Sequence, residues 1–261
     1  MTRGARKLRA FVRAPSAALN RCELVHLPRV PIDVGRARRQ HAVYVAALME
    51  LGATIEWLAP LDDRPDAVFV EDTAIILPEA IVLAWPGVAS RQSEVASVER
   101  LLSQHRAVRS VQPPGFLDGG DVLTLGRRVL VGISTRTNPA GIAQLREALA
   151  PSGYSVDAAR VRGCLHLKSA CTVIDEHRVV ANLEFIERAV LGDVEIVEVD
   201  AREPRAANTL TVAGTTLFSA AFPRTGERLN AAGLRTRAID VSELEKAESG
   251  LTCMSLLLTE S

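Results

Sequence analysis

Two acidic segments carry side chains that could bind a cation. Glu71 and Asp72 follow the apolar run at residues 67–70, which predicts a strand whose tip faces a cleft. Asp118 and Asp121 flank a pair of glycines, a choice suited to a sharp bend or to a backbone that lies close to a ligand. A solvated strand end and an ordinary hairpin connection would have the same compositions. Neither segment alone decides between a binding site and a turn.

A histidine and a cysteine add a proton carrier and a nucleophile. His166 lies between two leucines, where partial desolvation would let the imidazole titrate near neutral pH. Cys253 lies at the start of the last apolar run, and its thiolate would be a nucleophile. Each of these residues, taken alone, is more often a buried core residue than a catalytic one.

Together, the four features have one economical interpretation. A guanidinium group is a planar cation with five donors, so carboxylates in its plane hold it well. A thiolate above that plane can attack the central carbon while an imidazole protonates the departing amine. A carboxylate beside the imidazole would orient it. The sequence therefore predicts hydrolysis of a guanidine C–N bond, with neither a metal nor an organic cofactor.

Hydrophobic periodicity predicts helices that alternate with short strand-like runs. An amphipathic helix is expected at about residues 36–51, where Gly52 ends it, and a second at residues 91–105. Asn followed by Pro predicts the start of a third helix, over residues 138–150. Shorter helical segments are expected at residues 185–190 and 227–232.

A hairpin, a helix and a linking strand recur about every 50 residues, which indicates a repeat architecture of the α/β class. Five such units fit the chain. The fifth hairpin would pair residues 251–257 with an N-terminal strand near residues 22–26, and so close a ring without an exposed sheet edge. A three-layer α/β sheet is the main competitor, but no glycine-rich phosphate loop follows any of the predicted strands.

Composition limits the classes of partner. The 31 basic and 31 acidic side chains cancel, so no overall field favours nucleic acid or a membrane surface. We expect a cytoplasmic protein, because no apolar run has the length of a membrane span or of a secretory core after the basic start. The basic residues 1–20 are expected to be a flexible segment of a single catalytic domain, residues 1–261. Cys22, Cys164 and Cys171 are interpreted as free core or incidental thiols.

Six short motifs occur in a fixed order along the chain: FVED (69–72), LDGGDVL (117–123), STRTN (134–138), HLKS (166–169), SELEK (242–246) and LTC (251–253). In this order they resemble the dimethylarginine dimethylaminohydrolase family, from about Leu24 to the C-terminus. The resemblance implies the fold of that family, a five-bladed, pseudo-symmetric propeller of ββαβ units called the pentein fold. It agrees with the five repeats counted above.

The resemblance also implies roles for the reactive residues. Cys253 matches the nucleophile, His166 the proton donor and later general base, and Asp118 the third catalytic residue, which also contacts the guanidinium group. Asp72 matches the second guanidinium carboxylate, with Glu71 beside it. The implied reaction attaches the substrate carbon to sulfur and releases dimethylamine and then citrulline.

Further positions match those that hold the amino-acid end of the substrate. Arg91 and Arg136 match arginines that bind the α-carboxylate, a task suited to the guanidinium fork. Asp66, Leu27 and Ala247 match positions around the α-amino group, the last two through backbone groups. A valine is the residue expected at position 247, but a change there matters little if only the carbonyl is used. The basic N-terminal segment has no counterpart in the resemblance.

Several alternatives stay open at this stage. The same fold and chemistry serve hydrolases and deiminases of arginine or agmatine, and amidinotransferases that need room for an acceptor amine. A catalytically idle propeller used as a binding scaffold is a hypothesis of another class. It predicts the loss of the cysteine, the histidine or a guanidinium carboxylate, and all are present. The expected partner is a small methylarginine substrate, and the chain is expected to be a monomer or a homodimer.

Overall fold

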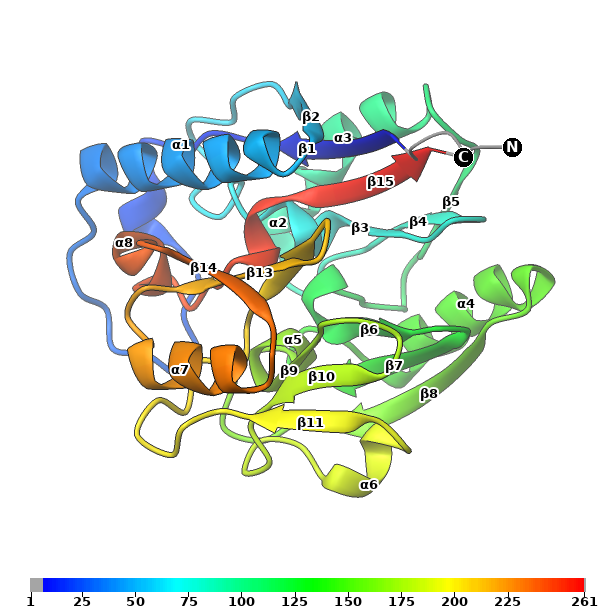
Figure 1. Cartoon of the computed structure of the whole chain (residues 1–261). Coiled ribbons are helices and arrows are strands. Elements are labelled where there is room, and N and C mark those ends of the chain that lie inside the picture. The colour runs from blue at the N-terminus through cyan, green and yellow to red at the C-terminus, as the bar shows by residue number, and fades with distance from the viewer. Residues whose placement is uncertain (1–6, 261) are drawn as a thin grey trace, which may run out of the picture.

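The computed structural model describes residues 7–260, in which five three-stranded sheets surround a common centre (Figure 1). The sheets are β1 (Lys7–Val12), β2 (Ala53–Trp57) and β15 (Leu256–Glu260); β3 (Ala74–Ile76), β4 (Ile81–Leu83) and β5 (Val108–Ser110); β6 (Val122–Leu125), β7 (Arg128–Ile133) and β8 (Ser155–Arg160); β9 (Cys171–Val173), β10 (Arg178–Ala181) and β11 (Glu195–Glu198); β12 (Leu210–Val212), β13 (Thr215–Ser219) and β14 (Arg235–Ile239).

Each sheet repeats one connection. Its first strand pairs antiparallel with the middle strand, and a helix then leads to a third strand parallel to the middle one. The connecting helices lie at the periphery of the ring (Figure 1). They are α1 (Val34–Glu50), α3 (Val95–Leu102), α4 (Pro139–Leu149), α6 (Arg188–Leu191) and α7 (Pro223–Ala231). The predicted α/β ring of five ββαβ units is thereby confirmed.

The ring closes at a different strand from the one predicted. β15 pairs antiparallel with β1, at residues 7–12, whereas residues 22–26 form a loop. Ala10, Phe11 and Val12 are buried in the core, and Arg9 bonds to Glu56 and Glu260 on the neighbouring strands. The expectation of a flexible segment over residues 1–20 was therefore wrong from residue 7 onward. Residues 1–6 of that segment lie outside the described residues.

Other predicted elements differ in their ends. The run at residues 67–70 is not a strand, because the chain turns there into the 3₁₀ turn η2 (Val70–Thr73). The helix predicted at residues 91–105 is two helices, α2 (Ala89–Gln92) and α3. The segment predicted as helical from residue 185 becomes helical only at α6. By contrast, the Asn138 side chain accepts the Gly141 N–H and caps α4 as expected.

The core is divided among the units. Each outer helix packs its apolar face on its own sheet, and clusters of buried aliphatic side chains fill the space between neighbouring sheets. First strands of neighbouring units contact one another near the centre, as β15 does with β3 and β9 with both β6 and β12. Among residues 7–260, no helix combines the length and apolarity needed to cross a bilayer.

Candidate active site

The repeat brings one short turn from each unit to the centre of the ring. In four units a single helical turn directly precedes the first strand: η2 before β3, η3 (Gly119–Asp121) before β6, α5 (Leu167–Ala170) before β9, and η5 (Thr252–Met254) before β15. Asn208 occupies the corresponding place before β12. Because the units are related by pseudo-symmetry, motifs far apart in the sequence meet here. This explains why the reactive residues occur at the first strands.

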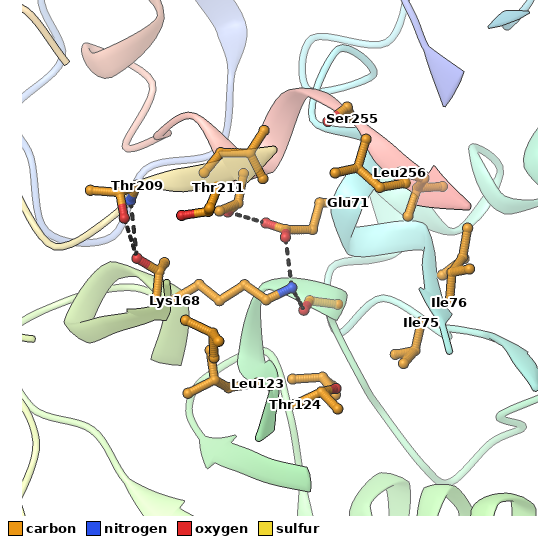
Figure 2. Close-up of a pocket in the computed structure, with 18 residues that line it drawn as sticks. Glu71, Ile75, Ile76, Leu123, Thr124, Lys168, Thr209, Thr211, Ser255 and Leu256 are labelled. Carbon is orange, nitrogen blue, oxygen red and sulfur yellow. Dashed lines mark hydrogen bonds and ion pairs between the residues drawn. The ribbon is translucent and has the colours of Figure 1, made fainter. Parts of the chain in front are cut away.

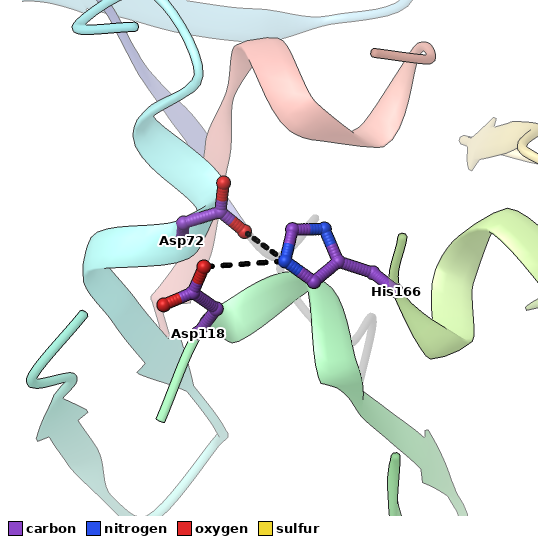
Figure 3. Close-up of side chains that lie close together, drawn as sticks. All are labelled: Asp72, Asp118 and His166. Atoms are coloured by element: carbon purple, nitrogen blue, oxygen red, sulfur yellow. Dashed lines mark hydrogen bonds and ion pairs between the residues drawn. The ribbon is translucent and has the colours of Figure 1, made fainter. Parts of the chain in front are cut away.

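Three of the predicted residues converge directly (Figure 3). The His166 Nε2 atom lies 3.2 Å from Asp118 Oδ2 and 4.0 Å from Asp72 Oδ1. All three side chains are almost completely buried. Each comes from a different central turn, since Asp72 lies in η2, Asp118 precedes η3, and His166 caps α5. The arrangement holds two carboxylates and an imidazole within bonding distance of one small ligand.

The carboxylates favour a protonated imidazole. Burial alone would lower the pKa of His166, but Asp72, Asp121 and Asp118 outweigh it and raise that pKa to about 9. Burial alone would raise the pKa of Asp72, but the positive charges of His166 and Arg91 lower it to about 2. Near neutral pH the site therefore holds an imidazolium beside the ionised carboxylate of Asp72. Such an imidazolium is a proton donor.

The thiol of Cys253 faces the same cavity as His166 and Asp72. Its Sγ accepts the Gly250 N–H at 3.3 Å. Burial, together with the negative charges of Glu71 and Asp72, raises the pKa of Cys253 well above its ordinary value. The free protein therefore holds a neutral thiol, and a cation bound between the carboxylates would favour the thiolate.

The cavity between these groups is small. Its volume is about 20 Å³, roughly the room for one water molecule. Asp66, Arg91, Arg136 and Ala247 line it, as the resemblance implied for the amino-acid end of a substrate. Leu27 instead lines a larger neighbouring pocket of about 260 Å³. An amino acid can enter only if part of this wall moves.

The two arginines of the wall differ in their surroundings. Arg91 donates to Asp72 at 2.6 Å, to Glu94 at 2.9 Å and to the carbonyl oxygen of Phe69 at 2.8 Å, so most of its donors are occupied. Arg136 lies 3.7 Å from Asp118 through its Nη1 atom, a looser contact. Arg136 is therefore the arginine that is freer to turn toward a bound carboxylate.

Glu71 does not line this cavity, although Asp72 does. Its carboxylate points toward Lys168 (Figure 2). Its two oxygens accept hydrogen bonds from Lys168 Nζ and Thr252 Oγ1, each at 2.6 Å. It lines a second central cavity of about 240 Å³ on the other side of the turn. Burial raises the pKa of Glu71, and the Lys168 ammonium opposes that rise. In this structure Glu71 is a neighbour of the candidate site, separated from the cavity that holds Cys253.

Two glycines make the close approach of these turns possible. A Cβ atom at Gly120 would lie 2.8 Å from both Asp72 Oδ1 and His166 Nδ1. One at Gly119 would overlap the carbonyl oxygen of Glu71. The Gly120 N–H also donates to Asp72 Oδ1 at 3.0 Å. The paired glycines thus serve the close backbone approach that their sequence context suggested.

Several residues around the site had no predicted role. Asn208 bridges two turns, because its amide accepts the Thr252 N–H at 3.0 Å and donates to the Lys168 carbonyl at 3.2 Å. Lys168 reaches Glu71, and Glu248 borders the cavity. The signal available for Lys168 was its place in the HLKS motif. No sequence motif pointed to Asn208, whose place before β12 corresponds to that of the helical turns in the other four units.

A metal site is geometrically conceivable at the same place. Among the described residues, Asp72, Asp118 and His166 offer ligand atoms that all lie within 4.8 Å of one another. However, Asp72 already accepts a hydrogen bond from Arg91, and the charged form of His166 has no free lone pair for a metal. The donor set is better matched to an organic cation that itself supplies N–H groups.

Known proteins are similar to this chain in sequence and in fold. A family model described as arginine deiminase matches residues 47–222. Dimethylarginine dimethylaminohydrolase from Streptomyces coelicolor is 36% identical over 262 residues, and the match covers 97% of each chain. The chain belongs to the dimethylarginine dimethylaminohydrolase family.

Solved structures of the family agree with the fold. The dimethylarginine dimethylaminohydrolase of Pseudomonas aeruginosa, a cysteine-to-serine mutant complexed with citrulline, has a TM-score of 0.91 at 29% identity. That comparison covers 97% of this chain and 99% of the other. A histidine-to-glycine variant with an S-methyl-L-thiocitrulline adduct has a TM-score of 0.89, also at 29% identity, over 96% and 98% of the two chains. The pentein fold predicted for this chain is confirmed.

Proposed function

We propose that the protein hydrolyses Nω-methylated arginine to citrulline and a methylamine through a covalent adduct on Cys253. The observation that carries the proposal is the convergence of Asp72 and Asp118 on His166, whose imidazole lines, with Asp72, the cavity that also holds the Cys253 thiol. The family relatives of that name, and the citrulline complex of one of them, support the same activity.

Substrate binding prepares the nucleophile. The guanidinium group brings a positive charge and several N–H donors between Asp72 and Asp118, where it stabilises the Cys253 thiolate. The displaced proton leaves to solvent, because His166 is already protonated near neutral pH. The cost of forming a buried thiolate is therefore offset only when a cationic substrate is bound. This dependence protects the thiol between turnovers.

The thiolate then attacks the central guanidinium carbon. His166 donates its proton to the departing nitrogen, because an uncharged amine is a far better leaving group than an amide anion. The C–N bond breaks, dimethylamine leaves, and an S-alkylthiouronium group remains on Cys253. The neutral His166 next takes a proton from water, which attacks the same carbon. The C–S bond breaks, and citrulline and the thiolate are released.

Hydrolysis of unmethylated arginine is the second candidate, favoured by the arginine deiminase family model that matches residues 47–222. Both reactions use the same groups and differ only in the space around the departing nitrogen. Closely related pockets can differ there by a single side chain. The substrate must therefore be settled by turnover.

The test is to incubate the protein in parallel with asymmetric dimethylarginine, monomethylarginine, arginine and agmatine. Citrulline or carbamoylputrescine and the released amine are measured, and Cys253→Ser is compared with Cys164→Ser as a matched control. We expect turnover of the methylated substrates, lost in Cys253→Ser and kept in Cys164→Ser. If only arginine or agmatine is turned over, that compound takes the place of methylarginine as the proposed substrate. If none of the four guanidines is turned over, the proposed activity is rejected.

A further inference from the structure

Asp121 is a buried carboxylate that does not face the cavity. It ends the turn η3, three residues after Asp118, and its side chain is completely shielded from solvent. Its Oδ1 accepts the Leu167 N–H at 3.0 Å, and its Oδ2 accepts the Ser134 hydroxyl at 2.6 Å. A buried carboxylate is costly unless such donors surround it. The two bonds run to two different parts of the site.

One bond reaches the turn that carries His166. Leu167 is the first residue of α5, and its N–H follows His166 directly along the chain. The carbonyl oxygen of the same peptide group, that of His166, accepts the Ser169 N–H at 3.0 Å within the turn. The Asp121 Oδ1 atom holds the N–H side of this peptide group, so it helps to orient the backbone at His166 and with it the path of the imidazole toward Asp118.

The other bond reaches the segment that carries Arg136. The Ser134 hydroxyl oxygen accepts the Arg136 N–H at 3.0 Å while it donates to Asp121. Ser134 and Arg136 lie in the loop between β7 and α4, away from α5 in the sequence. One carboxylate thus connects the candidate acid/base residue to the candidate carboxylate-binding arginine.

A glycine in β7 allows the backbone of that strand to lie against Asp121 and Leu167. A Cβ atom at Gly132 would lie 2.5 Å from Asp121 Oδ1 and 3.0 Å from the Leu167 Cβ atom. The backbone of β7 therefore approaches Asp121 at a distance that only glycine permits without a shift. Close packing of this kind fixes the carboxylate in one orientation.

We propose that Asp121 is a positioning residue for the hydrolase reaction, which orients His166 through the Leu167 N–H and Arg136 through Ser134. The inference rests on the proposed function, because His166 and Arg136 would contact the two ends of the same bound substrate. Any buried carboxylate needs donors, but both donors of Asp121 come from segments that carry candidate site residues.

Charge adds a second contribution. His166 faces Asp72 from η2, Asp118 and Asp121 from the segment at η3, and the Cys253 thiol across the cavity. Arg91 and Arg136 lie behind the first two carboxylates. Asp121 has no guanidinium partner of this kind in the described structure; burial raises its pKa to about 6, and its charged form and the imidazolium stabilise each other. Its removal should destabilise the protonated form of His166.

The test replaces Asp121 by Asn, which keeps the shape and an acceptor for the Leu167 N–H but removes the charge. The ¹H NMR titration of the His166 ring, followed without substrate, is expected to shift to lower pH by about one unit. With the substrate that the wild type turns over, kcat is expected to fall by about 10- to 100-fold. An unchanged titration together with an unchanged kcat would overturn the proposal.

Ser134→Ala tests the other connection and does not depend on Asp121→Asn folding well. We expect it to raise KM for amino-acid substrates by about 3- to 10-fold with little change in kcat, because only the arginine end is loosened. An unchanged KM would reject that half of the proposal. The ring titration needs no turnover, so it can be interpreted even if the proposed function is wrong. A His166 titration in Asp121→Asn that equals the wild type's, in an active enzyme, would reject the role of Asp121 and leave the proposed function intact.

Discussion

The Glu248 carboxylate accepts the backbone N–H of Leu27 and so joins the loop before α1 to the rim of the cavity. The N–H groups of Val25 and His26 donate to the same carboxylate. Three consecutive amides around one anion form a binding concavity of the nest type. Glu248 itself lines the cavity, so this carboxylate holds residues 25–27 beside it.

Replacing Glu248 by Gln should loosen the loop. Hydrogen bonds to a charged acceptor contribute about 1.5–3 kcal/mol, so loss of the charge should speed amide exchange at residues 25–27 by about 10-fold or more. Hydrogen–deuterium exchange followed by mass spectrometry measures this directly. Glu147→Gln, a change of an exposed glutamate on α4, is the matched control. Equal exchange in the two variants would show that Glu248 does not hold the loop.

The pH dependence of kcat/KM follows from the two raised pKa values at the site. In the free protein Cys253 is a neutral thiol and His166 is charged below its pKa of about 9. The reactive pair, a thiolate with an imidazolium, contains one proton fewer than this resting form. Protonation of the thiolate removes this reactive pair, so kcat/KM should rise by about tenfold per pH unit as the pH increases toward 9.

The measurement is kcat/KM from pH 6 to 10 with a substrate whose guanidinium group stays charged throughout. The Cys164→Ser variant should give the same profile, because Cys164 lines the neighbouring pocket and a serine keeps a donor for the His166 carbonyl oxygen that Cys164 contacts. A profile that is flat above pH 7 would mean that His166 is already neutral there, contrary to the influence of its three carboxylate neighbours.

The sequence predicted which candidate catalytic side chains lie together better than it predicted their surroundings. His166, Asp118 and Cys253 each occur where the type of side chain is itself informative, and they do converge with Asp72. Glu71 was grouped with Asp72 because the two are adjacent. On a 3₁₀ turn, however, neighbouring side chains point in different directions, so one faces the cavity and the other faces Lys168.

The closure of the ring was harder to predict. The basic composition near the N-terminus concealed a strand, because Arg9 forms ion pairs with Glu56 and Glu260 that become visible only when three strands lie side by side. The apolar sequence Ala10-Phe11-Val12 was the available signal. Pairing between distant ends of a chain depends on tertiary contacts and cannot be read from local propensity.

Gly120→Ala should reduce activity without unfolding the protein. Its added methyl group would lie 2.8 Å from both Asp72 Oδ1 and His166 Nδ1, so one of these side chains must move. Displacement of a reacting group by a fraction of an ångström to 1 Å lowers kcat by up to about 100-fold. Gly35→Ala, in the first turn of α1, is the control and should leave kcat unchanged. Normal kcat in Gly120→Ala would mean that the two turns can separate without affecting the reaction.

Arg91→Ala should mainly lower stability and Arg136→Ala should mainly weaken substrate binding, although both residues line the cavity. Arg91 bonds to Asp72 and Glu94, and its removal leaves two buried carboxylates without their main partner. Breaking a buried pair in this way costs about 3–5 kcal/mol, so the melting temperature should fall by about 6–20 °C. Glu94→Gln in the Arg91→Ala background should recover part of the loss, since it removes one of the uncompensated charges.

Arg136→Ala should instead act on substrate binding. Its contact with Asp118 is looser, at 3.7 Å, and its expected partner is the α-carboxylate of the substrate. We expect KM for amino-acid substrates to rise by at least about 10-fold with a smaller change in the melting temperature. Calorimetry and steady-state kinetics on both variants measure the contrast. Equal losses of stability with no change in KM would show that Arg136, like Arg91, serves mainly to neutralise a buried carboxylate.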